Sequence, residues 1–319
     1  MTTFVTGSRS TAVLAALSAG AVVLAGCGGA SDSEGREGGQ AGVTVVAGFY
    51  PLEWAAARVG GDRVDVSSLT PPGAEAHDLE LAPQDVAAVA EADLMVYLDG
   101  FQPALDEAAA SEAGDSAWDA GLAADLTRAA APHEGEDEDE AHSDEDAVDP
   151  HFWLDPVRLA AVGDALAERL TELDPDGATA YEENAAALRA DLEDLDSEMQ
   201  EGLATCATDT LVTAHDAFGY LADRYGFEVV GISGLSPSQE PEPAQLAEIA
   251  ELVSERGVTT VYTETLVDPA VAETVAAEAG VQTAVLDPLE GLTDESAGDD
   301  YLAVMRANLA TLQEGQTCS

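Results

Sequence analysis

The sequence predicts an α/β fold of two lobes, each built on a parallel β-sheet, joined by one long rigid helix. Short apolar runs rich in β-branched residues alternate with helical patterns in two separate sets. Strands that alternate with helices of about 10–15 residues form parallel sheets covered on both faces. The stretch between the two sets is helical throughout, and 319 residues are enough for two hydrophobic cores.

The strands and helices of both sets can be placed from their patterns. The expected strands are Val43–Phe49, Val64–Thr70 and Asp93–Asp99 in the first set, and Thr210–His215, Glu228–Ser233, Val258–Glu264 and Thr283–Leu289 in the second. The expected helices include Pro83–Glu91, Pro243–Arg256, Pro269–Ala279 and Asp299–Gln313. These elements predict a Rossmann-like lobe over residues 43–155 and another over 206–319.

Residues 156–205, between the lobes, are expected to form a helical linker. Asp155-Pro156 has the residues of an N-cap followed by a first-turn proline, and it starts a helix to about Leu173. From Asp176 to Leu203 the apolar side chains fall on one stripe, which predicts a helix roughly 40 Å long. A helix of this length can run along both lobes. A coiled coil is the weaker alternative, because the stripe covers only about three heptads.

The N-terminus has the features of an export signal. Arg9 precedes an apolar run, Thr11–Leu24, that ends in Leu-Ala-Gly-Cys27 and is shorter than a typical membrane span. The ending resembles a bacterial lipobox, which predicts a signal peptide over residues 1–26 and acylation of Cys27. A plain signal peptide or a single membrane anchor is the alternative. Residues 27–42 would then tether the protein to the outer face of the cell membrane.

The chain is strongly acidic, with 63 acidic residues against 11 basic ones, all of them arginine. Such a surface repels nucleic acid and anionic lipid and attracts cations, so we expect no nucleic-acid partner. Because the acids are spread along the whole chain, adaptation to a saline habitat explains most of the charge. One segment, His133–Asp149, concentrates ten carboxylates and two histidines, a composition typical of a mobile loop.

Two cysteines, Cys206 and Cys318, follow Cys27. An exported chain meets an oxidising environment, where two thiols pair more often than they stay free. We therefore expect a disulfide that pins the C-terminus to the second lobe. Closing a loop of roughly a hundred residues stabilises a fold by up to about 4–5 kcal/mol.

The histidines indicate the chemistry. His77 and His215 follow or end expected strands, His151 follows the acidic segment, and Asp287 ends another strand. Ligands of doubly wound sheets bind beyond the carboxyl ends of the strands, so these four side chains could meet in a cleft between the lobes. Three imidazoles and a carboxylate suit tetrahedral Zn²⁺ better than Mg²⁺ or Ca²⁺. A single histidine is more often structural, and only the equivalent placement of three favours a metal site.

Five sequence blocks carry a family resemblance. They are Phe49-Tyr50-Pro51, Pro71-Pro72-Gly73-Ala74-Glu75-Ala76-His77-Asp78, Asp149-Pro150-His151-Phe152-Trp153-Leu154-Asp155-Pro156, Thr213-Ala214-His215-Asp216-Ala217-Phe218-Gly219-Tyr220 and Gly234-Leu235-Ser236-Pro237. From about Val43 to its end, the chain resembles the zinc-type solute-binding proteins of bacterial ABC importers, of the ZnuA/TroA kind. The fold of that family, with the metal in a cleft between two lobes joined by a long helix, agrees with the prediction above.

The resemblance implies that His77, His151 and His215 bind the metal through imidazole nitrogens. Manganese binders of the family usually have a carboxylate at the position of His215. The histidine here therefore implies Zn²⁺, with Mn²⁺ or iron as the alternative.

The fourth ligand differs within the family between an acid near the last strand, an acid beside the first histidine, and water. Asp287 matches the first of these, and Ala76 beside His77 argues against the second. Asp287 is therefore the expected ligand, with Glu75 or water as alternatives. Three further acids could line the cleft or serve only as caps and surface; these are Asp78, Asp216 and Glu264.

The acidic segment matches in position the histidine-rich loop of the family but holds only His133 and His142. It could collect cations and pass them to the cleft, or be merely solvated. The implied partners are an ABC permease with its ATPase, and the membrane through the lipid anchor, with the protein acting as a monomer.

Three other functions compete with zinc import. A zinc hydrolase needs an open water position, which a fourth ligand closes, and no nucleophile–base pair stands out. We therefore expect no enzymatic activity. A zinc-binding adhesin or a metallochaperone on the same fold would have the same site, and the sequence does not separate either from an importer component.

Overall fold

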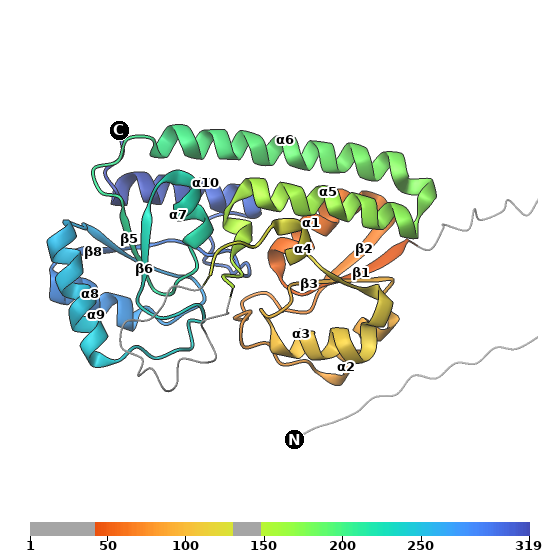
Figure 1. Cartoon of the computed structure of the whole chain (residues 1–319), viewed down its shortest axis with the longest axis horizontal. Coiled ribbons are helices and arrows are strands. Elements are labelled where there is room, and N and C mark those ends of the chain that lie inside the picture. The colour runs from red at the N-terminus through yellow and green to blue at the C-terminus, as the bar shows by residue number, and fades with distance from the viewer. Residues whose placement is uncertain (1–41, 130–147) are drawn as a thin grey trace, which may run out of the picture. The chain divides into compact units, whose positions relative to one another are not determined.

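Two four-stranded parallel sheets form the framework of this computed structural model, which describes residues 42–129 and 148–319 (Figure 1). In sheet order the first sheet has β2 (Val64–Ser68), β1 (Val43–Ala47), β3 (Leu94–Tyr97) and β4 (Ala117–Asp119). The second has β6 (Glu228–Gly231), β5 (Thr210–Thr213), β7 (Thr260–Thr263) and β8 (Gln282–Val285). Both lobes thus share one parallel topology, and the predicted fold class is confirmed.

The seven predicted strands are all present, and each ends earlier than predicted. The loops after β2 and β5 carry His77 and His215, and Glu264 directly follows β7. β4 was not predicted, because a three-residue strand, Ala-Trp-Asp, is too short to show alternation. In β1, Val45 pairs with Val66 of β2 and with Leu94 of β3, which places it at the centre of a buried sheet.

Helices surround both sheets. They are α1 (Tyr50–Gly60), α2 (Pro83–Glu91), α3 (Pro103–Ala108), α4 (Gly121–Ala124), α5 (Pro156–Leu173), α6 (Ala178–Leu203), α7 (Gly219–Tyr225), α8 (Pro243–Arg256), α9 (Ala270–Ala279) and α10 (Tyr301–Gly315). α5 begins as predicted: Pro156 is its first residue, and the Asp155 carboxylate accepts the N–H of Val157 at 3.0 Å.

The 26-residue helix α6 is the predicted long helix, about 39 Å at 1.5 Å per residue. Its predicted apolar stripe is buried throughout; the stripe consists of Tyr181, Leu188, Leu192, Leu195, Met199 and Leu203. The helix packs on α5, on α1 of the first lobe and on α10 of the second, and Figure 1 shows it running along both lobes. Cys206, just beyond the end of α6, forms the predicted disulfide with Cys318, just beyond the end of α10.

Some predictions fall outside the described residues. These are the signal peptide over residues 1–26, the acylated Cys27, the tether as far as residue 41, and the acidic segment from His133 to residue 147. Within residues 42–129 and 148–319, no helix is both long enough and apolar enough to cross a membrane.

Candidate metal centre

His77 lies in the loop between β2 and α2, and its neighbours hold that loop in place. The Glu75 carboxylate accepts the backbone N–H groups of His77 and Asp78 at 2.8 and 3.0 Å. Gln102 donates through Nε2 to the carbonyl just before His77, at 2.9 Å. The imidazole packs edge-on against Phe101, with ring centroids 4.6 Å apart. Glu75, an alternative fourth ligand in the sequence analysis, is therefore engaged in holding the histidine loop.

His151 is fully buried just before a short 3-10 turn, η4 (Phe152–Leu154). Oδ1 of Asp149 accepts both the backbone N–H of His151 and its ring Nδ1, each at 2.9 Å. A proton held on Nδ1 by a carboxylate leaves the lone pair on Nε2 free for a ligand bond. Asp149 was predicted to belong to the acidic loop, but the structure places it in the support of His151.

His215 is supported in the same way from the neighbouring strand. It follows β5, and Glu264 directly follows β7, which lies beside β5 in the sheet. Both carboxylate oxygens of Glu264 lie 2.8 Å from Nδ1 of His215, and Oε1 also accepts its backbone N–H at 3.1 Å. The parallel pairing of β5 with β7 therefore brings Glu264 to His215. The carboxylate on Nδ1 again leaves Nε2 free.

The three Nε2 atoms meet one carboxylate oxygen. Nε2 of His151 lies 3.3 Å from that of His77 and 3.4 Å from that of His215. Oε1 of Glu290 lies 3.2 Å from Nε2 of His215 and 3.5 Å from each of the other two. Among the described residues this oxygen is buried and has no hydrogen-bond partner. An unsatisfied carboxylate oxygen facing three imidazole nitrogens is a donor set that fits a tetrahedral cation.

The carboxylate that lies with the three histidines in the structure is that of Glu290, whereas Asp287, expected there from the sequence, lies outside this cluster. Asp287 is buried, but its carboxylate accepts the N–H of Leu289 at 2.8 Å and the hydroxyl of Ser296 at 3.1 Å. β8 already ends at Val285, so a side chain reaches the histidines only after the chain has turned beyond the sheet edge. The sequence did contain a signal, because Glu290 is an acid within the apolar run that follows Pro288.

Charge is strongly coupled within this cluster. Burial lowers the pKa of His77. Burial acts in the same direction on His151 and His215, but their carboxylate partners outweigh it, so the pKa of His151 is raised and that of His215 is raised well above its usual value. Burial acts to raise the pKa of Glu290, yet the three imidazoles that face its carboxylate hold that pKa well below its usual range. Burial and the charge of Glu290 raise the pKa of Glu75 to about 7. An incoming metal ion would therefore compete with protons on the imidazoles.

Arg128 links the support of His151 to the second lobe. Its Nε lies 3.3 Å from Oδ2 of Asp149, and its Nη1 lies 2.8 Å from Oδ1 of Asp223 in α7. A Cβ at Gly219, the first residue of α7, would collide with both the guanidinium and the Asp149 carboxylate. The missing side chain at Gly219 therefore lets α7 approach this ion pair.

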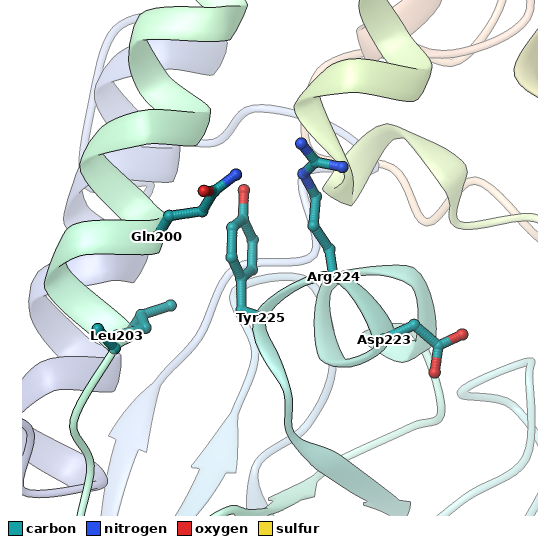
Figure 2. Close-up of a pocket in the computed structure, with 6 residues that line it drawn as sticks. Gln200, Leu203, Asp223, Arg224 and Tyr225 are labelled. Atoms are coloured by element: carbon teal, nitrogen blue, oxygen red, sulfur yellow. The ribbon is translucent and has the colours of Figure 1, made fainter.

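Apart from the histidine cluster, a pocket of ≈ 570 Å³ lies beside α6 and α7 (Figure 2). It is lined by Gln200, Leu203, Ala204, Asp223, Arg224 and Tyr225. Its charged groups are already paired, because Arg224 donates to Asp196 at 2.6 Å and Asp223 accepts from Arg128 at 2.8 Å. These lining residues offer a ligand no unpaired charge, so the histidine cluster remains the candidate site.

Residues 45–315 match the sequence family described as zinc-uptake complex component A, periplasmic (ZnuA). The chain belongs to this family. It is 35% identical over 302 residues to zinc-binding lipoprotein AdcA of Streptococcus pneumoniae R6, covering 92% of this chain and 58% of AdcA. It is 33% identical over 303 residues to the high-affinity zinc uptake system protein ZnuA of Bacillus subtilis, covering 92% of this chain and 93% of that protein. The chain thus spans little more than half the length of AdcA.

Solved structures place this ZnuA-family protein in the same fold. The laminin-binding protein Lmb of Streptococcus agalactiae, described as having adhesin and metal-transporting activity, is 33% identical, with a TM-score of 0.73 over 86% of this chain and 100% of that chain. Zn(II)-bound AdcA of S. pneumoniae is 33% identical, with a TM-score of 0.71 over 86% of this chain and 58% of that chain. The predicted resemblance and the predicted two-lobed fold are confirmed.

Proposed function

We propose that this ZnuA-family protein captures Zn²⁺ outside the cytoplasm and delivers it to an ABC-type importer. The ion would be bound by His77, His151, His215 and Glu290. The observation that carries the proposal is the convergence of three Nε2 atoms on Oε1 of Glu290, with all four donor atoms within 4.8 Å of one another. Two of the imidazoles are fixed by carboxylates in the tautomer that leaves Nε2 free to bind.

The donor set favours Zn²⁺ over Mn²⁺ or iron. Three imidazoles and one carboxylate form a four-coordinate N/O site, whereas Mn²⁺ prefers more oxygen ligands and binds more weakly in the divalent series. The supporting carboxylates of Asp149 and Glu264 add negative charge behind the imidazoles, which strengthens them as donors.

We infer that the protein binds the ion without enzymatic turnover. A catalytic zinc usually keeps three protein ligands and one position for water or substrate. In the proposed site the carboxylate of Glu290 occupies the fourth position, so no position remains for an activated water.

Export and membrane attachment through Cys27 remain part of the proposal, as do the partner permease with its ATPase and the monomeric state. The capture role of His133 and His142 also remains a proposal, and deletion of the acidic segment tests it. Because Asp149 supports His151, this deletion should stop at residue 147. That deletion should slow Zn²⁺ association while leaving equilibrium affinity nearly unchanged, which stopped-flow measurements would detect. Unchanged association kinetics would contradict the capture role.

Calorimetric titration of metal-stripped protein with Zn²⁺ and with Mn²⁺ tests the proposed site. Zn²⁺ should bind with one-to-one stoichiometry and more tightly than Mn²⁺. His215→Ala should lower zinc affinity by several kcal/mol, over ~100-fold. Glu228→Gln, which alters an exposed acid paired with Arg256, is the control and should bind like the native chain. Tighter binding of Mn²⁺, or full zinc affinity in His215→Ala, would refute the site.

A further inference from the structure

The residue before Glu290 has an unusual backbone conformation. Leu289 has φ = 60°, one of three non-glycine residues with positive φ in the described part of the chain. This left-handed conformation is unfavourable for a residue with a Cβ, and it persists only where surrounding contacts hold it. Leu289 is fully buried. The conformation therefore depends on contacts around residues 287–290, which we call the Glu290 turn.

Three consecutive peptide groups of the Glu290 turn are each held by a side chain. The Asn308 side chain bonds both the N–H and the carbonyl of Asp287, at 3.0 and 2.7 Å. The indole Nε1 of Trp153 donates to the carbonyl of Pro288 at 2.7 Å. The carboxylate of Asp287 accepts the N–H of Leu289 at 2.8 Å. The left-handed residue thus directly follows three fixed peptide groups, and Glu290, which comes next, faces the histidines.

Trp153 differs from the other supports because it comes from a different part of the chain. Asn308 and Asp287 belong to the second lobe, whereas Trp153 lies two residues after His151. Its indole is fully buried and packs against the rings of His151 and Phe49, with centroids 5.2 and 4.8 Å away. One rigid side chain therefore contacts one histidine of the cluster and holds the turn that carries the carboxylate.

We propose that Trp153 is a positioning residue for Glu290. Its indole N–H holds the Pro288 carbonyl and thereby keeps the left-handed turn that places Oε1 of Glu290 against the three Nε2 atoms. Trp153 thus links the carboxylate donor to the chain segment that carries His151, so that the donors assemble as one unit. This inference rests on the proposed zinc site, and it gives Asp287 a role as a support of the turn.

A double-mutant cycle tests this role. Trp153→Phe keeps an aromatic ring but removes the N–H donor, and Glu290→Gln removes the charge that the turn positions. Loss of a support of a metal ligand costs about 10-fold in affinity at the lower end. Trp153→Phe should therefore weaken zinc binding about 10-fold in the native chain and less than about 2-fold in the Glu290→Gln background. Trp118→Phe, in β4 of the first lobe, is the matched control and should change zinc affinity in neither background.

Equal losses in both backgrounds would mean that Trp153 acts only through general stability, and would overturn the proposal. No zinc binding by the native chain, or full affinity in Glu290→Gln, would instead refute the zinc site itself. Asp287→Asn perturbs the same turn from the other side and should show the same non-additivity with Glu290→Gln, which provides a second cycle should Trp153→Phe fold poorly. In the metal-free protein, hydrogen exchange of the Leu289 amide should accelerate in Trp153→Phe and not in Trp118→Phe. An unchanged exchange rate would also overturn the role.

Discussion

We expect the carboxylate of Glu264 to strengthen His215 as a metal ligand, and its replacement by glutamine isolates that contribution. Glu264→Gln keeps the size of the side chain and one oxygen acceptor, but it removes the negative charge from a group that is only 6% exposed. In the native protein both carboxylate oxygens lie 2.8 Å from Nδ1 of His215. The variant can therefore offer at most one neutral acceptor to a ring that two charged oxygens now hold.

The expected loss follows from this geometry. Removing a carboxylate that supports a metal-bound histidine typically lowers metal affinity by about 10–100-fold, or about 1.4–2.7 kcal/mol. Because Glu264 is buried, water cannot readily replace the lost contact. Its backbone bond to the N–H of His215, at 3.1 Å, can survive in the amide, which should keep the loop in place. We therefore expect the loss to appear in zinc affinity rather than in folding.

Competition titration with a chromophoric chelator would measure the change in zinc affinity, with thermal unfolding of the metal-free protein measured in parallel. Glu228→Gln makes the same chemical change at an exposed acid whose side chain is 56% accessible, and it should leave zinc affinity unchanged. A loss below about 3-fold in Glu264→Gln would refute the idea that the charge of Glu264 strengthens His215 as a donor.

Three further predictions concern pH, salt and the disulfide. Because the pKa values of His151 and His215 are raised, proton binding stabilises the metal-free fold at low pH, and this stabilisation is lost as pH rises through the raised values. Zn²⁺, in contrast, binds only the neutral imidazoles. The increase in Tm caused by zinc should therefore grow from about pH 6 to about pH 8, and an equal increase at both would contradict the assignment. Each arginine in the described residues is paired with an acid, so the remaining carboxylates repel one another. Tm should therefore rise as NaCl shortens the screening length from about 10 Å at 0.1 M to about 3 Å at 1 M. A fall in Tm would refute this repulsion. Cys206→Ser with Cys318→Ser opens a loop with a sequence separation of 112, which should cost up to about 4–5 kcal/mol in denaturant unfolding and leave zinc affinity unchanged.

The predictable parts of the fold come from local patterns. Apolar runs with flanking turns located seven of the eight strands in the described part of the chain, and the apolar stripe from Tyr181 to Leu203 located the long helix. β4 escaped because three residues carry no periodicity. The disulfide followed from there being only two cysteines after Cys27 and from the expected compartment, which needs no knowledge of the fold.

The histidines were also accessible from the sequence, because parallel strands align their carboxyl ends and so bring the residues that follow them to one edge. The carboxylates that support these histidines could not be assigned from the sequence. Asp149 was assigned to an acidic loop by composition, yet its carboxylate accepts two bonds from His151. Glu264 was one of several candidate acids, and the pairing of β5 with β7 singles it out.

By itself the sequence determined the fold class, the long helix, the cysteine pair and the three histidines that meet in the cluster, because each depends on periodicity, composition or strand ends. Only the tertiary structure brings the carboxylate of Glu290 to the three histidines and places Asp287 in the turn before it. The physical reason is that Glu290 follows the left-handed backbone of Leu289, in a turn that is bonded to Trp153 through the Pro288 carbonyl, 135 positions away in the sequence. A contact of that kind leaves no local pattern in the chain.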